Sequence, residues 1–192
     1  FHYKVREYQE AKLQYDYAYD RMSSEPIFLL DYGRLAYNTG TIDKAEKLFK
    51  KASKITSKIP ESLDPLQPFR WRSKIARLRK EPEREINLLY KLDEKVKIST
   101  LDSEVLEKSK VFFIERLPHC LIELAKSGED SSESRSQERL LEAWNHIEKN
   151  ISLAKEQDLT LALALHGVEV LTTLGRDERC KAFADEWSRE LN

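Results

Sequence analysis

Histidine and cysteine are the side chains that most often carry catalysis or hold a metal, and this chain has few of them. Its 192 residues include four histidines and two cysteines. Only His119 and Cys120 are neighbours, and adjacent helical residues point about 100° apart, so they would not face each other as a base and its nucleophile must. The remaining ones are isolated: His2, His146, His166 and Cys180. The sequence also has no glycine-rich phosphate loop, HExxH pair or paired CxxC motif. We therefore predict no enzyme, no metal site and no cofactor.

The lysines and arginines are spaced in a more informative way. Residues 50–80 carry ten of them against two acids, a local charge of +8 in a chain whose net charge is −1. Arg70, Lys74 and Arg77 recur at i, i+4 and i+7, so they share one helix face, which we call the basic stripe. Such a row can hold an acidic peptide, a phosphate or an RNA backbone, because guanidinium groups pair with oxyanions. The simplest alternative is a solvated helix face. No aromatic residue is interleaved on this face, which argues against nucleic acid.

The elements that position these side chains are expected to be helices. The chain is 35% charged and 40% hydrophobic, with only 5 Gly and 6 Pro, which favours an all-α fold with few turns. No run approaches the roughly 18 apolar residues that span a bilayer, so we expect no membrane insertion by this chain. The balanced net charge gives no global preference for nucleic acid.

The clearest local pattern is a helical hairpin over residues 26–60. Helical spacing predicts helices over residues 27–38 and from Asp43 onward, broken at Thr39, Gly40 and Thr41, where Gly40 suits a left-handed turn. The packing positions mix small and large residues: Leu29, Tyr32, Gly33 and Ala36 in the first helix, and Ala45, Leu48, Phe49 and Ala52 in the second. A hairpin of this size cannot bury its apolar face alone, so a similar unit must stack beside it.

That neighbour is upstream. Three residues precede residues of the same class by 34 positions: Ala11, Tyr15 and Ala18 precede Ala45, Phe49 and Ala52. A 34-residue helix–turn–helix period with small, bulky and small residues resembles the tetratricopeptide repeat. The resemblance is clearest over residues 1–60, and it implies antiparallel helical hairpins stacked as a short, irregular α-solenoid.

The rest of the chain departs from a strict repeat. A proline-rich linker at 60–68 precedes a diverged hairpin of helices 69–80, with Trp71, Ile75 and Leu78 inward, and 83–97. Its packing positions fall about seven residues late, since Ile86 lies 41 rather than 34 residues after Ala45.

Next come a long helix over 104–127, kinked or divided at Pro118, and a mobile polar loop over 128–137. Phosphorylation of Ser131, Ser132 or Ser134 in that loop would be a workable switch. Residues 138–192 then form C-terminal helices, the last hairpin of which, 159–174 and 177–191, suits a cap. We expect a single helical domain over 1–192, a fragment of a larger protein because the chain opens at Phe1 in mid-repeat.

The resemblance also implies a binding surface, because first helices of such repeats line a concave groove. It assigns five residues to that groove: Ile27, Leu30, Arg34, Tyr37 and Asn38. The alternative for Tyr37 is contact with an adjacent repeat. The Lys and Asn clamp that this family uses for a C-terminal carboxylate is absent, since Leu30, Asp31 and Arg34 stand at its positions.

The function implied is non-catalytic binding of a protein or peptide, which the basic residues would steer towards an acidic partner, in the cytoplasm or nucleus. Three alternatives stay open. The chain could be a regulatory or sensing arm of a larger enzyme or signalling ATPase. It could bind RNA or another polyanion through the basic stripe. It could self-associate through Tyr3, Tyr8 and Tyr15 if these are exposed.

Overall fold

The computed structural model describes residues 2–60, 64–101, 103–127, 132–156 and 159–190, with the backbone alone at residues 2–6, 103, 154–156, 160 and 189–190. The described part is helical and contains no strand. Its elements are α1 (His2–Met22), α2 (Pro26–Asn38), α3 (Ile42–Ala52), the 3-10 turn η1 (Thr56–Lys58), α4 (Gln67–Leu78), α5 (Pro82–Lys97), α6 (Ser103–Ser127), α7 (Glu133–Glu156), α8 (Thr160–Thr173) and α9 (Asp177–Glu190). None of the described helices is both long enough and apolar enough to cross a membrane.

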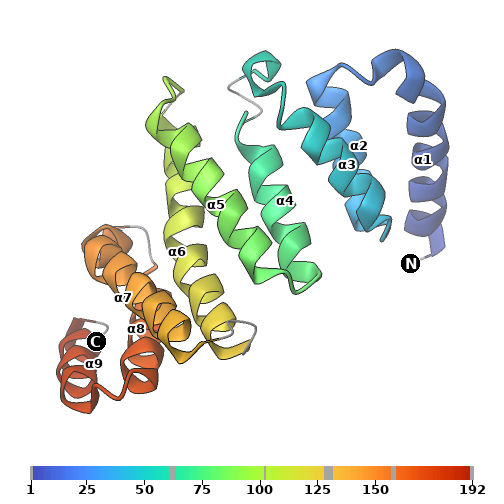
Figure 1. Ribbon diagram of the computed structural model, residues 1–192. Helices are drawn as coiled ribbons and strands as arrows, with labels where there is room; N and C mark the ends of the chain where they lie inside the picture. The colour runs from blue at the N-terminus through green and yellow to red at the C-terminus, as the bar shows by residue number, and fades with distance from the viewer. Residues whose placement is uncertain (1, 61–63, 102, 128–131, 157–158, 191–192) are drawn as a thin grey trace.

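Consecutive helices pack against one another along an elongated row, with the two ends of the chain at opposite ends of the row (Figure 1). Four hairpins follow the single helix α1: α2 with α3, α4 with α5, α6 with α7, and α8 with α9. The expected all-α, repeat-like architecture is therefore confirmed. The row arises because each hairpin has an apolar face that only its neighbours can cover.

The first hairpin packs as its sequence predicts. Leu29, Ala45 and Phe49 are completely buried. A Cβ atom on Gly33 would lie 2.6 Å from the Phe49 ring, so only glycine allows this approach of α2 and α3. On its other side, Phe49 stacks on Trp71 of α4 with ring centroids 5.5 Å apart. Phe49 thus joins the first hairpin to the second.

Helix α1 docks on α2 through aromatic side chains. Tyr15 stacks on Tyr32 with ring centroids 5.1 Å apart and also contacts Phe28. Tyr15, one of the three tyrosines of the self-association hypothesis, is half-buried because α2 covers one side of its ring. Tyr8 is exposed, at 42%, and the side chain of Tyr3 lies outside the described residues.

Three turns between paired helices share one geometry. Gly40, Lys80 and Gly175 each have positive φ, at 77°, 56° and 65°. In each turn the next residue donates its backbone N–H to the carbonyl five residues back, a Schellman closure: Thr41 to Ala36, Glu81 to Ala76 and Arg176 to Leu171, at 2.8, 3.0 and 2.9 Å. These turns align the first two hairpins at an offset of 40 residues. The residue of the second hairpin that corresponds to Ala45 is then Glu85. The predicted pairing of Ala45 with Ile86 is one position too far along the chain.

The last hairpin is closer to the repeat than its sequence indicates. A Cβ atom on Gly167 would lie 2.5 Å from the Phe183 ring, as one on Gly33 would meet Phe49. The close approach of glycine and phenylalanine is therefore repeated between α8 and α9. Counting from the turn glycines would place Ala184 rather than Phe183 opposite Gly167, because α8 has one more residue than α2 between its glycine and the turn.

Three expectations for the middle of the chain need correction. Of the two alternatives at Pro118, the division into two helices is wrong: α6 continues through the proline, and the side chains of Leu117 and Leu121 are buried in the core on both sides of it. Residues 133–137 of the expected polar loop belong to α7, and Ser132 Oγ accepts the N–H of Arg135 at its start. Ser131 lies outside the described residues. Leu78 is 55% exposed rather than inward, because α4 ends there.

Candidate functional site

The 40-residue offset brings the two predicted binding features onto one surface. It pairs each position of α2 with one of α4, so Leu30, Arg34 and Tyr37 correspond to Arg70, Lys74 and Arg77. We call the surface that carries Leu30, Arg34, Arg70, Lys74 and Arg77, together with Lys108 of α6, the α2–α4–α6 face. Sequence reasoning treated the groove and the basic stripe as separate features, because the linker at 60–68 changes the spacing from 34 to 40 residues.

A hollow of about 350 Å³ joins the two features and adds α6 to them. Three of the predicted groove residues line it, together with Asp31 from the clamp positions, the first residue of the stripe and three side chains that sequence reasoning missed: Ile27, Leu30, Arg34, Asp31, Arg70, Asp64, Gln67 and Lys108. Leu30 is 4% exposed and Ile27 is 44% exposed. The hollow therefore offers an apolar wall beside cations and carboxylates. Lys108 could not be predicted here because it comes from α6, far along the chain.

The other two predicted groove residues point elsewhere. Tyr37 packs edge-on against Trp71 with ring centroids 5.1 Å apart, so it contacts the following hairpin. Asn38 lines a different hollow of about 460 Å³, together with Tyr8 and Lys12 of α1. Of the five predicted groove residues, the structure brings three together.

Arg70 is the anchored member of the basic stripe. Its guanidinium pairs with Asp64 and donates to Ser109 Oγ at 2.6 Å. The Arg70 side chain is 15% exposed. Arg70 therefore ties the linker and α6 to α4, and its replacement would disturb the fold as well as any binding surface.

The other two members of the stripe are available to a partner. The Lys74 ammonium lies 4.7 Å from the centre of the Trp71 ring. Burial lowers the pKa of Lys74, and the neighbouring Arg77 and Arg70 lower it further. Arg77 is exposed, and among the described residues it forms no ion pair. An aromatic ring does accompany the stripe, contrary to expectation, but it is held between Phe49 and Tyr37.

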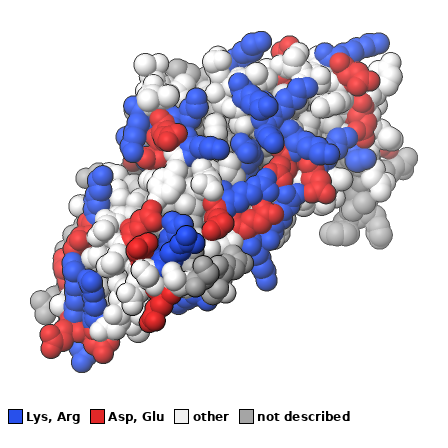
Figure 2. All heavy atoms as spheres, in the orientation of Figure 1, with Lys and Arg blue, Asp and Glu red and all other residues white. Residues whose placement is uncertain are grey.

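The remaining basic residues of the 50–80 segment lie on several surfaces. Figure 2 shows Lys and Arg side chains gathered over α3 and the adjacent part of α4. Lys50 and Lys54 are exposed on α3 and the turn after it. Arg79 pairs with Asp43 and Glu46, so acids from outside the segment neutralise part of its charge. The positive field on the α2–α4–α6 face is therefore smaller than +8.

The residues considered for catalysis do not form a catalytic pair. Cys120 is completely buried, and burial raises the pKa of its thiol. His119 lies at the surface of α6, where its Nε2 is 3.3 Å from Glu123 Oε1 and its ring is 5.3 Å from that of His166. Among the described residues, no cluster of His, Cys, Asp or Glu could hold a metal ion.

His146 is partly buried, with its ring edge-on to that of Phe113 at a centroid distance of 5.1 Å, and it predicts a pH dependence of stability. Burial lowers the pKa of His146 to about 4, against a backbone hydrogen bond with Ile114 that raises it. The unfolded chain binds this proton near pH 6.5 and the folded chain only near 4, so stability is lost as the pH falls through that window. Burial lowers the pKa of His166 in the same direction.

We expect the free energy of unfolding to fall by about 2 kcal/mol between pH 7 and pH 5 on account of His146. Urea denaturation at the two pH values measures this change. A His146→Leu variant, in which the site cannot titrate, should lose most of the difference. An equal pH dependence in the variant would show that other groups cause it.

Comparison with known proteins bears on the N-terminal part of the chain. Residues 2–56 match the model of a tetratricopeptide-repeat family, described as YpiA-like, C-terminal tetratricopeptide repeats. The match covers α1, α2 and α3, and it confirms the resemblance inferred from the 34-residue spacing. No curated protein matches the chain, and no solved structure matches it. Repeats of this kind generally mediate protein–protein interaction and are typically non-catalytic.

Proposed function

We propose that this chain is a non-catalytic module that binds a partner protein by holding an extended, acidic segment on the α2–α4–α6 face. The observation that supports this most directly is the shared hollow, in which Ile27 and Leu30 of the predicted groove meet Arg70 of the basic stripe. An apolar wall beside a row of cations suits a segment that combines an apolar anchor with carboxylates.

The spacing of the two available stripe residues suggests the form of that segment. Lys74 and Arg77 are three residues apart on α4, which places their Cβ atoms about 5 to 6 Å apart. In an extended strand, side chains two residues apart lie on the same side of the peptide, about 6.6 Å apart. We therefore expect an extended segment with acidic side chains two residues apart and an apolar side chain that enters the hollow.

RNA is a weaker candidate for this face. Base stacking needs an open aromatic ring. Trp71, the ring beside the stripe, is stacked on Phe49 and covered by Tyr37 and Lys74. A single-stranded nucleic acid could therefore use only phosphate contacts here.

The proposal predicts a specific effect of charge reversal. Peptides selected from a randomised library on the native chain should be acidic, and Lys74→Glu/Arg77→Glu should weaken their binding at least about tenfold for each charge. Fluorescence anisotropy with labelled selected peptides measures this. Arg70 is left intact, because it also supports the fold.

The matched control is Lys50→Glu/Lys54→Glu, which makes the same change in net charge on α3 and the adjacent turn. Peptide affinity should change by less than about threefold in this control, because exposed charges at a distance are screened. Equal losses in the two variants would show non-specific attraction and contradict the proposal. Tighter binding of single-stranded RNA than of any selected peptide would move the function to nucleic acid.

A further inference from the structure

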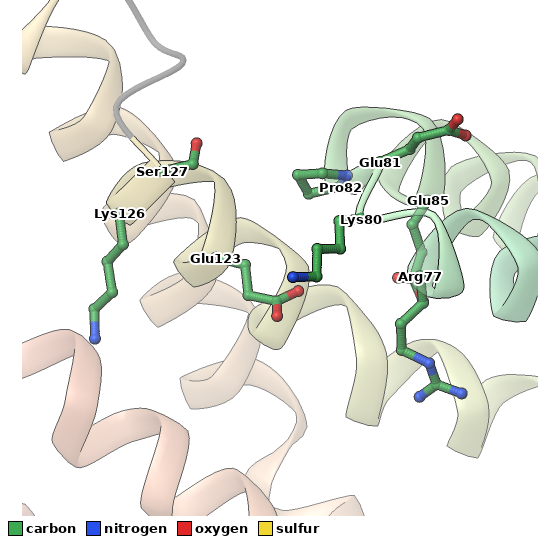
Figure 3. A pocket seen from close by; sticks show the side chains of 8 residues that line it. All are labelled: Arg77, Lys80, Glu81, Pro82, Glu85, Glu123, Lys126 and Ser127. Carbon is green, nitrogen blue, oxygen red and sulfur yellow. The ribbon is translucent and has the colours of Figure 1, made fainter.

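We infer that a second cleft, between the α4–α5 turn and the end of α6, binds the main chain of the partner peptide where it leaves the basic stripe. This inference rests on the proposed function. The cleft has a volume of about 510 Å³. Its lining, shown in Figure 3, consists of Arg77, Lys80, Glu81, Pro82 and Glu85 on one side and Glu123, Lys126 and Ser127 of α6 on the other.

Most charges that line the cleft have partners of their own. Glu81 accepts from Arg84 Nη1 at 2.7 Å. Glu85 is held by Arg116, and Lys126 pairs with Glu169 at 2.6 Å. Within the described residues, Lys80 and Arg77 form no ion pair.

Lys80 and Glu123 face each other across the cleft. Figure 3 shows the Lys80 side chain extending from the turn towards the Glu123 carboxylate, which projects from α6. Glu123 also contacts His119, at 3.3 Å from its Nε2. Lys80 therefore offers a hydrogen-bond donor from one wall of the cleft, and Glu123 offers an acceptor from the opposite wall.

The backbone of Lys80 is a second, independent observation. Its φ of 56° is in the left-handed region, where the equivalent turns of the other two hairpins have Gly40 and Gly175. A residue with a Cβ atom is strained in this conformation, and such strain is concentrated at binding sites. The strained lysine here is the one whose ammonium group extends into the cleft.

A peptide bond is the chemical complement of these two walls. It offers a carbonyl oxygen to the Lys80 ammonium and, in the opposite direction, an N–H to the Glu123 carboxylate. A carboxylate or phosphate alone would satisfy Lys80 but be repelled by Glu123. Arg77 lines the cleft and is also the last residue of the basic stripe, so a peptide that follows the stripe along α4 reaches the cleft next.

The test uses a capped peptide selected on the native chain, which carries an apolar anchor beside its acidic residues, as the probe and anisotropy titration as the readout. Lys80→Gly removes the ammonium while supplying the residue that the turn prefers, so its melting temperature should be unchanged or raised. Glu123→Gln keeps the size of the side chain and removes its charge. Each variant should weaken probe binding about tenfold, as expected for a hydrogen bond to a charged group.

Two controls separate this site from general charge effects. Lys54→Ala loses the same charge as Lys80→Gly at an exposed position away from the cleft, and it should change the affinity by less than about twofold. Backbone N-methylation of the probe should weaken binding to the native chain about tenfold and to Glu123→Gln less, because the N–H that is removed donates to a carboxylate in the native chain and only to a neutral amide oxygen in the variant.

Native affinity in Lys80→Gly and Glu123→Gln, with binding still lost in Lys74→Glu/Arg77→Glu, would overturn this inference and leave the proposed function standing. Native affinity in all three variants would overturn both. A loss in Lys80→Gly no larger than that in Lys54→Ala, or equal effects of N-methylation on the native chain and on Glu123→Gln, would also overturn the main-chain assignment.

Discussion

Replacing Glu85 with alanine is expected to lower the free energy of unfolding by about 3 to 5 kcal/mol, because it leaves a buried arginine without its counter-charge. Glu85 is 1% exposed and Arg116 is 8% exposed. The Glu85 carboxylate accepts hydrogen bonds from Arg116 Nε and Nη2 at 3.2 and 3.3 Å and from Ser73 Oγ at 2.8 Å. This group joins α4, α5 and α6, so its loss weakens the docking of α6 on the second hairpin.

Urea denaturation of the native chain and of Glu85→Ala measures this effect. Glu83→Ala is the matched control, because Glu83 is exposed on the same turn of α5, and it should change stability by less than about 0.5 kcal/mol. The double variant Glu85→Ala/Arg116→Met removes both charges, and it should be more stable than Glu85→Ala alone. If the double variant is the less stable of the two, the unpaired charge is not the cause of the loss.

The same three residues show where sequence reasoning reaches its limit. Helical periodicity predicted α4 and α5 and their pairing, because these depend on local spacing. Ser73 and Glu85 stand where the first hairpin has Gly33 and Ala45, two small residues. Arg116 makes a carboxylate acceptable at such a buried position, and it is 31 residues away from Glu85 on another helix. No local pattern reveals such a pairing.

The candidate site was predictable to the extent that it depends on helix positions. The spacing of Arg70, Lys74 and Arg77 identified one face of α4, and the repeat resemblance identified one face of α2. That these two faces form one surface depends on the 40-residue offset between the hairpins. The sequence did not predict this offset, because the proline-rich linker lengthens the 34-residue spacing. The contributions of Lys108 and Glu123 required the packing of α6, whose length and passage through Pro118 are set by tertiary contacts.

Replacing Phe49 with alanine is expected to cost about 3 to 5 kcal/mol of unfolding free energy, because a large side chain that is completely buried is removed. The ring fills the space between Gly33 and Trp71, and it stacks on Trp71 with an interplanar angle of 3°. The variant therefore leaves a cavity within the first hairpin and also weakens its contact with α4. Chemical denaturation and the melting temperature measure the loss.

The effect of Gly33→Ala on the free energy of unfolding should depend on the side chain at residue 49: we expect a loss of stability with phenylalanine there and a gain with alanine. In the native chain the added Cβ would meet two carbons of the Phe49 ring at 2.6 and 2.8 Å, and Trp71 stops the ring from moving away. We expect a destabilisation of about 1 to 3 kcal/mol from this overpacking. In Phe49→Ala the obstacle is absent, and the higher helix propensity of alanine should stabilise α2 by up to about 1 kcal/mol. Gly167→Ala is the matched comparison, and it should cost less than Gly33→Ala because Phe183 is only half-buried, whereas Phe49 is completely buried. Additive effects of Gly33→Ala and Phe49→Ala would show that ring contact does not determine the approach of α2 and α3.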